Sequence, residues 1–188
     1  MKHLPLIICD LEATCWKEEP YKDDMEIIEI GAVRVIDGVM ADEFQSMVKP
    51  VLHPELSEFC KQLTTITQSE VDAAKGFGEV YQSFMKWIGD QPFVFASWGR
   101  YDLKQLKLDV TRHQLPWNDG LERHINVKHA YAAFRKVKPC GMERALEWAK
   151  LPLVGTHHRG LDDARNIARI TLTMLDWLIE TEPFLHRE

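Results

Sequence analysis

Two carboxylates stand one residue apart near the start of the chain, in a setting that could hold a metal ion. Asp10 and Glu12 follow the apolar run Leu6–Cys9, which predicts a short buried strand. Alternate residues of a strand project to the same face, and open α/β sheets place their ligands where strands end. A divalent cation would offset the repulsion between the two acids, because such cations prefer hard oxygen ligands. The Asp-x-Glu pattern alone equally fits a solvated strand end.

A third acid, Asp102, occupies a similar place further along the chain. It follows a buried strand predicted over Phe93–Ala96 and opens a helix predicted over Asp102–Val110. A carboxylate at the end of a strand could be another metal ligand. Asp is also favoured at helix starts without any function, since it caps the first amides and suits the helix dipole. The residue alone leaves both interpretations open.

Two histidines precede a fourth acid in the run from Thr156 to Arg165. His157 and His158 are expected in a loop, and Asp163 in the first turns of the following helix. Histidine is the natural general base near neutral pH, so one imidazole could accept a proton while the acid holds a metal. A histidine pair at a loop tip is also commonly just solvated. An acid in a first helical turn is favoured electrostatically in any case.

Strands and helices in mixed order are expected to position these groups. A strand pattern over Glu26–Ile36 ends in Asp37-Gly38, a strong hairpin indicator, and a return strand is predicted over Glu43–Val48. Other expected elements are a short helix from Ser57 to Cys60, a capping box at Thr67–Glu70, a helix over Phe77–Ile88, a strand at Ile125–Val127, and helices over Gly141–Ala149 and from Leu161 to about Glu180. This order predicts a single α/β domain over residues 1–188 with a mixed sheet.

The composition predicts a cytoplasmic globular protein without membrane association. The 188 residues are 45% hydrophobic and 28% charged, which is ordinary for a soluble domain. No apolar run approaches the roughly 20 residues needed to cross a bilayer. The four cysteines form no C-x-x-C pair, which excludes zinc-ribbon and thioredoxin-type sites. The sequence carries no prediction of oligomeric state.

Charge is unevenly spread along the chain. The net charge of −6 argues against a general nucleic-acid coat protein. Residues 98–150 nevertheless carry 11 basic and 6 acidic side chains, whereas residues 1–97 carry 8 basic and 17 acidic ones. An acidic half beside a basic stretch could be a metal site next to a phosphate-binding surface. Ordinary surface variation is the alternative.

Together, Asp10-x-Glu12, Asp102 and His158-x4-Asp163 resemble the DEDDh 3′-to-5′ exonucleases in order and local context. The resemblance covers roughly residues 6–178. Within this family, the sequence is most similar to the branch containing the 3′ histone mRNA exonuclease. It extends to the motifs Asp-Leu-Glu-Ala-Thr-Cys (10–15), Glu-Ile-Ile-Glu-Ile (26–30), Leu-Ser-Glu-Phe-Cys (56–60), Leu-Thr-Thr-Ile-Thr-Gln (63–68) and the run over 158–170.

The resemblance implies an RNase H-like exonuclease fold, in which helices flank a mixed five-stranded sheet. It also implies two-metal-ion hydrolysis that releases nucleoside 5′-monophosphates from the 3′ end of RNA or single-stranded DNA. Two Mg²⁺ or Mn²⁺ ions would be held by Asp10, Glu12, Asp102 and Asp163. The family spacing selects His158 as the base, because the register His157 with Asp162 would move the acid about 100° around the helix.

The same resemblance implies a pocket for the 3′-terminal nucleotide. Phe59 and Tyr101 would sandwich the terminal base, although the family usually has Trp at the second position. The backbone at Ala13 and Thr14 would meet the terminal hydroxyl, and Leu63, Thr64 and the residues up to Thr67 would line the sugar pocket. The alternative for Phe59 is a core position in a short helix.

Two other function classes stay open at this point. A catalytically silent nucleic-acid-binding module of the same fold would be expected to lack one of the acids or the histidine, and all five are present. A phosphodiesterase or metal hydrolase acting on other substrates would not need an aromatic platform for a base. Phe59 and Tyr101 disfavour that alternative.

Overall fold

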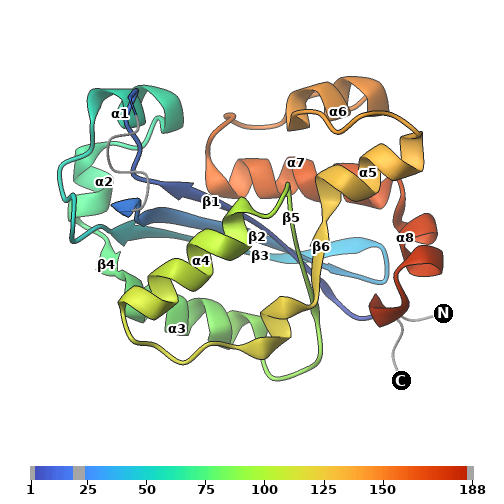
Figure 1. Ribbon diagram of the computed structural model, residues 1–188, viewed down its shortest axis with the longest axis horizontal. Coiled ribbons are helices and arrows are strands. Elements are labelled where there is room, and N and C mark those ends of the chain that lie inside the picture. Colours follow the sequence, from blue (N-terminus) through green and yellow to red (C-terminus); the bar gives the residue numbers. More distant parts are fainter. Residues whose placement is uncertain (1–2, 19–23, 186–188) are drawn as a thin grey trace.

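A six-stranded mixed sheet forms the centre of the computed structural model, which describes residues 3–18 and 24–185. The strand order is β4-β3-β2-β1-β5-β6 (Figure 1). The bounds are β1 Leu6–Ala13, β2 Ile27–Ile36, β3 Val39–Lys49, β4 Lys75–Gly76, β5 Val94–Ser97 and β6 His124–Asn126. The first three strands form an antiparallel meander, whereas β5 runs parallel to β1 and β6 parallel to β5. The predicted mixed sheet is therefore confirmed, with β4 as a two-residue addition to the five expected strands.

The hairpin between β2 and β3 forms where the sequence predicts it. Asp37 and Gly38 both adopt positive φ angles, 49° and 81°. Such angles suit a tight turn whose twist matches the flanking strands. The turn sets the register in which Ile36 pairs with Val39.

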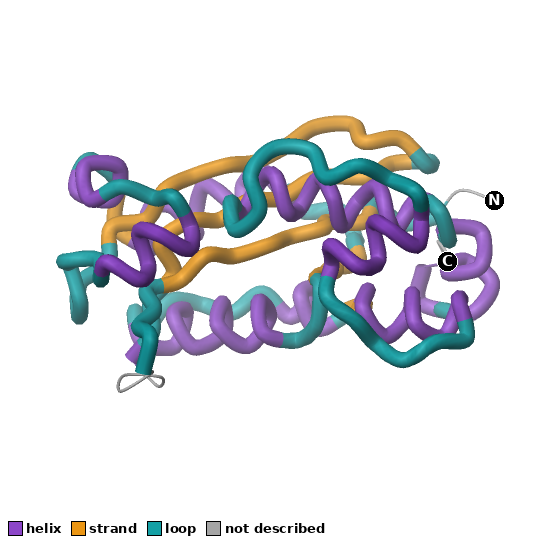
Figure 2. The backbone as a smooth tube through the Cα atoms, turned by 90° about the horizontal axis from the view of Figure 1, so that it is seen from above, coloured by secondary structure: helices purple, strands orange, loops and turns teal. Residues whose placement is uncertain are grey.

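Helices cover both faces of the sheet (Figure 2). Their bounds are α1 Glu58–Thr64, α2 Gln68–Asp72, α3 Phe77–Ile88, α4 Tyr101–Arg112, α5 Val127–Arg135, α6 Met142–Ala149, α7 Gly160–Leu172 and α8 Leu175–Thr181. One core layer joins α3 and α4 to the sheet, and the other joins α5, α6, α7 and α8 to its opposite face. None of these helices is both long and apolar enough to cross a bilayer.

Alternation along β1 decides which side chains face which layer. Leu6 and Ile8 lie in the core layer of α7, whereas Ile7, Cys9 and Leu11 lie in that of α3 and α4. Because the strand period is two, Asp10 and Glu12 continue the face that α7 covers. The strand runs to Ala13, four residues further than the apolar run predicts, and so carries both acids.

The start of α7 lies directly on β2, through two glycines. A Cβ atom at Gly31 would overlap the carbonyl carbon of Gly160, the first residue of α7. In turn, a Cβ at Gly160 would lie 3.1 Å from the carbonyl oxygen of Asp10. Only residues without side chains permit this approach, which brings the first turn of α7 against the acidic end of β1.

Two predicted elements differ from the structure. Ile125–Val127 is predicted as a strand, but the strand ends at Asn126, whose side chain caps the unpredicted helix α5. The long C-terminal helix predicted from Leu161 to about Glu180 is divided at Thr173 and Met174 into α7 and α8. Neither glycine nor proline marks this break, so the sequence pattern carries no indication of it.

Candidate active site

Three acids from two elements meet at the end of β1. Ligand oxygens of Asp10, Glu12 and Asp163 all lie within 4.8 Å of one another. Glu12 and Asp163 are buried, with 8% and 4% of their surface exposed, and Asp10 is partly exposed. The alternation of β1 places the first two acids on one face, and the glycine contact places Asp163 opposite them. A constellation of distant sequence positions is thus assembled by backbone packing.

Asp102, in the first turn of α4, contributes the fourth carboxylate. It is 5% exposed, and its Oδ1 accepts a hydrogen bond of 3.2 Å from the backbone N–H of Leu11, between Asp10 and Glu12. Asp102 is not the helix cap: Arg100 occupies that position and makes no side-chain cap bond. The carboxylate is thus directed to β1, the strand that carries Asp10 and Glu12. This contact excludes the alternative that Asp102 is simply a helix-capping residue.

Burial raises the pKa of every acid in this cluster. Desolvation and the adjacent charge of Asp102 hold the pKa of Asp10 well above its usual range. Burial, followed by the charge of Asp163, raises the pKa of Glu12 to about 9. Burial also raises the pKa of Asp102 to about 6, against opposing hydrogen bonds, and raises that of Asp163. Without a compensating cation, the cluster therefore retains protons that isolated carboxylates would lose.

The donor set fits divalent cations with oxygen preference. Asp10, Glu12, Asp102 and Asp163 supply only hard carboxylate oxygens, which suit Mg²⁺ or Mn²⁺ better than the softer metals. Burial and the neighbouring carboxylates raise the pKa of Asp10 and Glu12, and a bound cation would offset both effects. Zinc-type sulfur ligation is not part of this arrangement.

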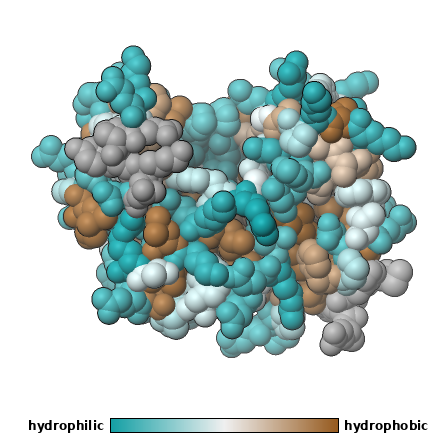
Figure 3. Space-filling model, in the orientation of Figure 1, coloured by the Kyte–Doolittle hydropathy of each residue, from teal (hydrophilic) through white to brown (hydrophobic). Residues whose placement is uncertain are grey.

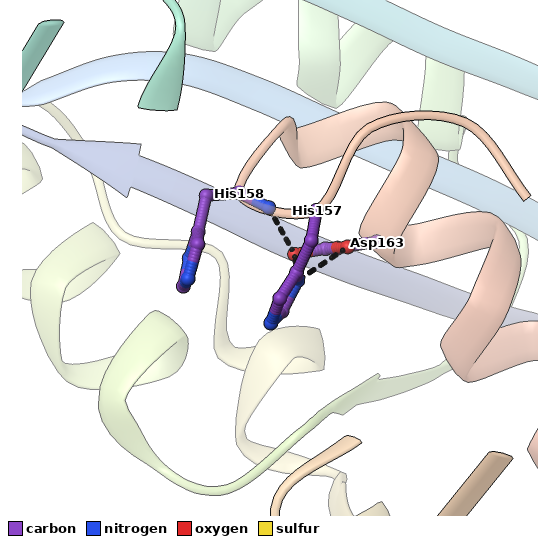
Figure 4. Close-up of side chains that lie close together, drawn as sticks. All are labelled: His157, His158 and Asp163. Carbon is purple, nitrogen blue, oxygen red and sulfur yellow. Dashed lines mark hydrogen bonds and ion pairs between the residues drawn. The ribbon is translucent and has the colours of Figure 1, made fainter. Parts of the chain in front are cut away.

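Both histidines lie against the fourth acid (Figure 4). The backbone N–H of His158 donates to Oδ2 of Asp163 at 2.9 Å. Nδ1 of His157 lies 2.9 Å from Oδ2 and 3.1 Å from Oδ1 of the same carboxylate. The two imidazoles stack, with centroids 4.0 Å apart and planes inclined by 18°. Asp163 therefore contacts the ring of one histidine and the backbone of the other.

His158 is held in an unusual backbone conformation. Its φ of 62° lies in the left-handed region, which non-glycine residues seldom adopt. Burial, followed by the neighbouring His157, lowers the pKa of the His158 imidazole. A lowered pKa keeps this ring neutral at neutral pH, as a proton acceptor requires. The family spacing selects His158 as the base, whereas the ring in contact with the Asp163 carboxylate is that of His157.

Another buried acid, Glu29, supports the start of α7 and is not among the residues singled out from sequence. It is fully buried and lies opposite Glu12 in the β1–β2 pair. Its Oε2 accepts hydrogen bonds from Arg159 Nε at 3.2 Å and from the backbone N–H of Gly160 at 3.0 Å. The motif Glu-Ile-Ile-Glu contained it, but a strand residue alone gave no indication of its partner. Glu29 fixes the loop that carries the histidines.

The residues expected to bind the terminal nucleotide divide into two groups. Phe59, Leu63 and Tyr101 expose 37%, 36% and 45% of their surface, which is unusual for large apolar side chains. Phe59 is therefore not a core residue of its helix. In contrast, Ala13, Thr14 and Thr64 are buried.

The two threonine hydroxyls already have partners within the fold. Thr14 Oγ1 accepts from the backbone N–H of Glu26 at 2.9 Å. Thr64 Oγ1 donates to the carbonyl of Cys60 and accepts from the N–H of Ile66. These two side chains maintain the walls of the site, so a contact with substrate there would come from the backbone.

The elements around the acids leave a recess. In Figure 1, α1 and α6 stand apart at the upper edge of the molecule, with the loop that leads into α7 between them. Figure 3, in the same orientation, shows a hydrophilic hollow between these two projections. The exposed side chains of Phe59 and Leu63 come from α1, on one side of this recess.

Comparison with known proteins agrees with this geometry. The RNase T family model, described as "Exonuclease", matches residues 7–171. A solved structure of the nuclease domain of 3′hExo, described as a DEDDh family member bound to rAMP, is 31% identical with a TM-score of 0.87, covering 99% of this chain and 97% of that one. The chain belongs to the DEDDh exonuclease family. The RNase H-like exonuclease fold and the divalent-metal dependence of this family follow from that membership.

Relatives of this DEDDh chain are named as exoribonucleases. ERI1 exoribonuclease 2 of Danio rerio is 34% identical over 193 residues, covering 90% of this chain and 35% of the relative. The 3′-5′ exoribonuclease 1 of Homo sapiens is 33% identical over 181 residues, covering 90% and 52%. The chain thus spans about a third to a half of these relatives. A further solved structure, of a 3′-exonuclease in 3′-end specific recognition of a histone mRNA stem-loop, is 32% identical with a TM-score of 0.85, covering 92% of this chain and 64% of that one.

Proposed function

We propose that this DEDDh chain is a 3′-5′ exonuclease that hydrolyses the last phosphodiester bond of RNA or single-stranded DNA and releases nucleoside 5′-monophosphates. The observation that carries the proposal is the meeting of Asp10, Glu12 and Asp163 within 4.8 Å, with Asp102 bonded to the strand between the first two. A proton-accepting side chain lies beside this cluster in His158. The names of the relatives support the same reaction.

The four carboxylates would hold two Mg²⁺ or Mn²⁺ ions. When bound, these ions supply charge stabilisation for the attacking and leaving oxygens and lower the pKa of water. The task of the chain is to hold the acids at fixed positions despite their mutual repulsion. Leu11 does this for Asp102 by donating its N–H, and the N–H of His158 does it for Asp163.

His158 would accept the proton of the attacking water. Its lowered pKa keeps the imidazole neutral, and its backbone bond to Asp163 ties its position to one of the acids. The ring of His157 stacks on one face of the His158 imidazole. Such a base contributes typically a hundredfold or more to turnover.

The 3′-terminal nucleotide would be held between α1 and α4. The exposed rings of Phe59 and Tyr101 offer stacking faces for a base, each worth about 1–3 kcal/mol regardless of sequence. Leu63 extends the apolar surface, and the backbone at Ala13, Thr14 and Thr64 would face the sugar. A 3′ phosphate would bring negative charge towards the acids, so a free 3′ hydroxyl is the expected end. This selectivity for an end makes the enzyme an exonuclease.

A catalytically silent module of the same fold is the rival interpretation. Such a module would have no reason to maintain four acids at raised pKa, because each retained proton reflects a cost of burying charge. A cytoplasmic location and a single domain over residues 1–188 remain predictions from composition and element order.

Digestion of an oligomer panel tests the proposal. RNA and DNA oligomers of the same sequence, single-stranded and duplex, are incubated with Mg²⁺ or Mn²⁺, and the released nucleotides are identified by mass. We expect 5′-monophosphates from the 3′ end of single strands, with little release by the Asp10→Asn variant. Products with a 3′ phosphate, or equal release by both proteins, would contradict the proposal.

A further inference from the structure

Lys128 brings a positive charge to the rim of the acid cluster. It is the second residue of α5, the helix that the sequence pattern did not predict, and it is half-buried. Its Nζ lies 3.9 Å from the position that a Cβ would take on Gly99, in the loop between β5 and α4. Asp102 follows three residues after Gly99, and the Lys128 charge acts on it to lower its pKa.

The ammonium group has no carboxylate within ion-pair distance among the described residues. Its position also carries a small cost to the helix, since a cation in the first turn opposes the helix dipole. A lysine with a purely structural role at such a place would form an ion pair or extend fully into solvent. Lys128 is instead a half-buried residue whose charge acts on Asp102 of the acidic cluster. The ammonium group of Lys128 is therefore available to bind an anion from outside the chain.

The surroundings of Lys128 place it on the side of the acids away from α1. Its charge also acts on Cys140, just before α6, as does that of Arg144. Trp98 links the loop after β5 to the segment before α6, because its Nε1 donates to the carbonyl of Cys140 at 3.3 Å. The aromatic faces of the terminal-base pocket begin at Phe59 on α1. A strand whose last base occupies that pocket must therefore leave the acids towards the α5–α6 side.

We propose that Lys128 binds a phosphodiester group of the substrate strand, at or directly upstream of the bond that is cut. This inference rests on the proposed function and adds a phosphate-binding residue to it. Lysine suits the role because its ammonium group is a compact point charge that donates to any non-bridging phosphate oxygen and makes no base-specific contact. The contact would also explain how a chain with net charge −6 attracts a polyanion at its most acidic site.

Substitution with a matched control provides the test. Lys128→Ala and Lys128→Arg are compared with Lys86→Ala, which removes the same charge from an exposed site on α3. That site is distant, because the carbonyls of the next residues, Trp87 and Ile88, accept hydrogen bonds from Arg34 of β2. Arg34 pairs with Ile7, near the start of β1 and away from the acids. Thermal melting of each variant checks that the fold is retained.

The kinetic readout is kcat/KM on a single-stranded oligomer at several salt concentrations. We expect Lys128→Ala to lower kcat/KM about tenfold or more, with partial recovery by Lys128→Arg and no change for Lys86→Ala. The slope of log kcat/KM against log salt should become shallower by about 0.7, as for one lost contact to a single strand. Equal slopes for Lys128→Ala and the unchanged protein would overturn the proposal.

A binding readout assigns the phosphate and is independent of turnover. Fluorescence anisotropy in EDTA compares oligomers that carry one neutral methylphosphonate at the last or the penultimate linkage. The affinity difference between Lys128→Ala and the unchanged protein should vanish for one of these oligomers and persist for the other. A difference that persists for both contradicts the inference. An unchanged protein that binds with this pattern yet releases no nucleotides would instead overturn the proposed function alone.

Discussion

The backbone N–H of His158 donates to Oδ2 of Asp163 at 2.9 Å, so the candidate base and a candidate metal ligand are held by one hydrogen bond. His158 makes this bond from a left-handed backbone conformation, with φ of 62°. Strain of this kind persists only where the surroundings enforce it, and it concentrates at functional sites. A shift of Asp163 would therefore also shift the His158 imidazole, the candidate general base.

Neutralising Glu12 should stabilise the metal-free protein. Its pKa of about 9 lies far above the roughly 4.3 of an unfolded chain, so the folded protein loses stability as pH rises between these values. Glu12→Gln removes that loss. We expect the melting temperature in EDTA at pH 8 to rise by at least a few degrees, measured by calorimetry, and to depend less on pH.

The matched measurement adds Mg²⁺ to both proteins. Divalent cation should raise the melting temperature of the unchanged protein clearly and that of Glu12→Gln little, because the variant has lost a ligand. A metal-free Glu12→Gln protein that melts at or below the unchanged one at pH 8 would contradict the account of repulsion in the cluster.

Substituting His158 should remove most turnover without unfolding the protein. Asn tolerates the left-handed conformation better than Ala, so His158→Asn isolates the loss of the base from backbone strain. We expect both variants to lose more than roughly a hundredfold in kcat. The unchanged enzyme should keep its activity to a lower pH than an ordinary histidine base would allow, since burial lowers the pKa of His158, and the variants should lack this acid limb.

His157→Asn is the control for that experiment. Its ring contacts Asp163 without being the proposed base, so its loss should change the Mg²⁺ dependence more than the pH profile. A hundredfold loss for His157→Asn together with near-normal activity for His158→Asn would reverse the assignment.

Removing one aromatic face of the terminal-base pocket should weaken substrate binding. The low end of the stacking energy corresponds to about tenfold in affinity. We expect Phe59→Ala and Tyr101→Ala each to raise KM for short oligomers by about tenfold with kcat largely kept. Tyr101→Trp should lower KM. Val39→Ala, an exposed apolar site on the β2–β3 hairpin, serves as control. Efficient digestion of 3′-phosphorylated ends would contradict the pocket.

Glu29→Gln should reduce activity although Glu29 is not a proposed ligand. The change weakens the buried contact to Arg159 and leaves the N–H of Gly160 with a poorer acceptor. We expect lower kcat at saturating Mg²⁺, partial loss of the acid limb and a lower melting temperature. Unchanged kinetics with the same loss of stability would limit Glu29 to a structural role.

The sequence predicts the acids better than it predicts how they meet. The period of β1 correctly places Asp10 and Glu12 on one face, and Phe77–Ile88 is a helix with the predicted bounds. The approach of α7 could not be predicted, because it depends on Gly31 and Gly160 lying against each other across 129 positions. Residue spacing predicts structure within one segment of the chain, whereas the contact between Gly31 and Gly160 joins two distant segments.

The missed helix α5 shows a second limit. Val127 and Tyr131 are buried at helical spacing, but the β-branched pair at Ile125 and Val127 dominates the local pattern as a strand. Asn126 decides the matter by capping the helix through its side chain, which accepts from the N–H of His129. Likewise, the contact between His157 and Asp163 follows from the turn of the loop and not from residue spacing.

The most direct test of the proposed exonuclease site measures how the length of a 5′-labelled single-stranded RNA oligomer changes with time. The oligomer is incubated with Mg²⁺ or Mn²⁺ and then with excess EDTA. The four acids and His158 predict a ladder that shortens by one nucleotide at a time from the 3′ end, stops in EDTA, and is absent for Asp163→Asn. Full degradation in EDTA, or internal cuts that appear before the ladder, would contradict the claim that these acids form a metal-dependent 3′-5′ exonuclease site.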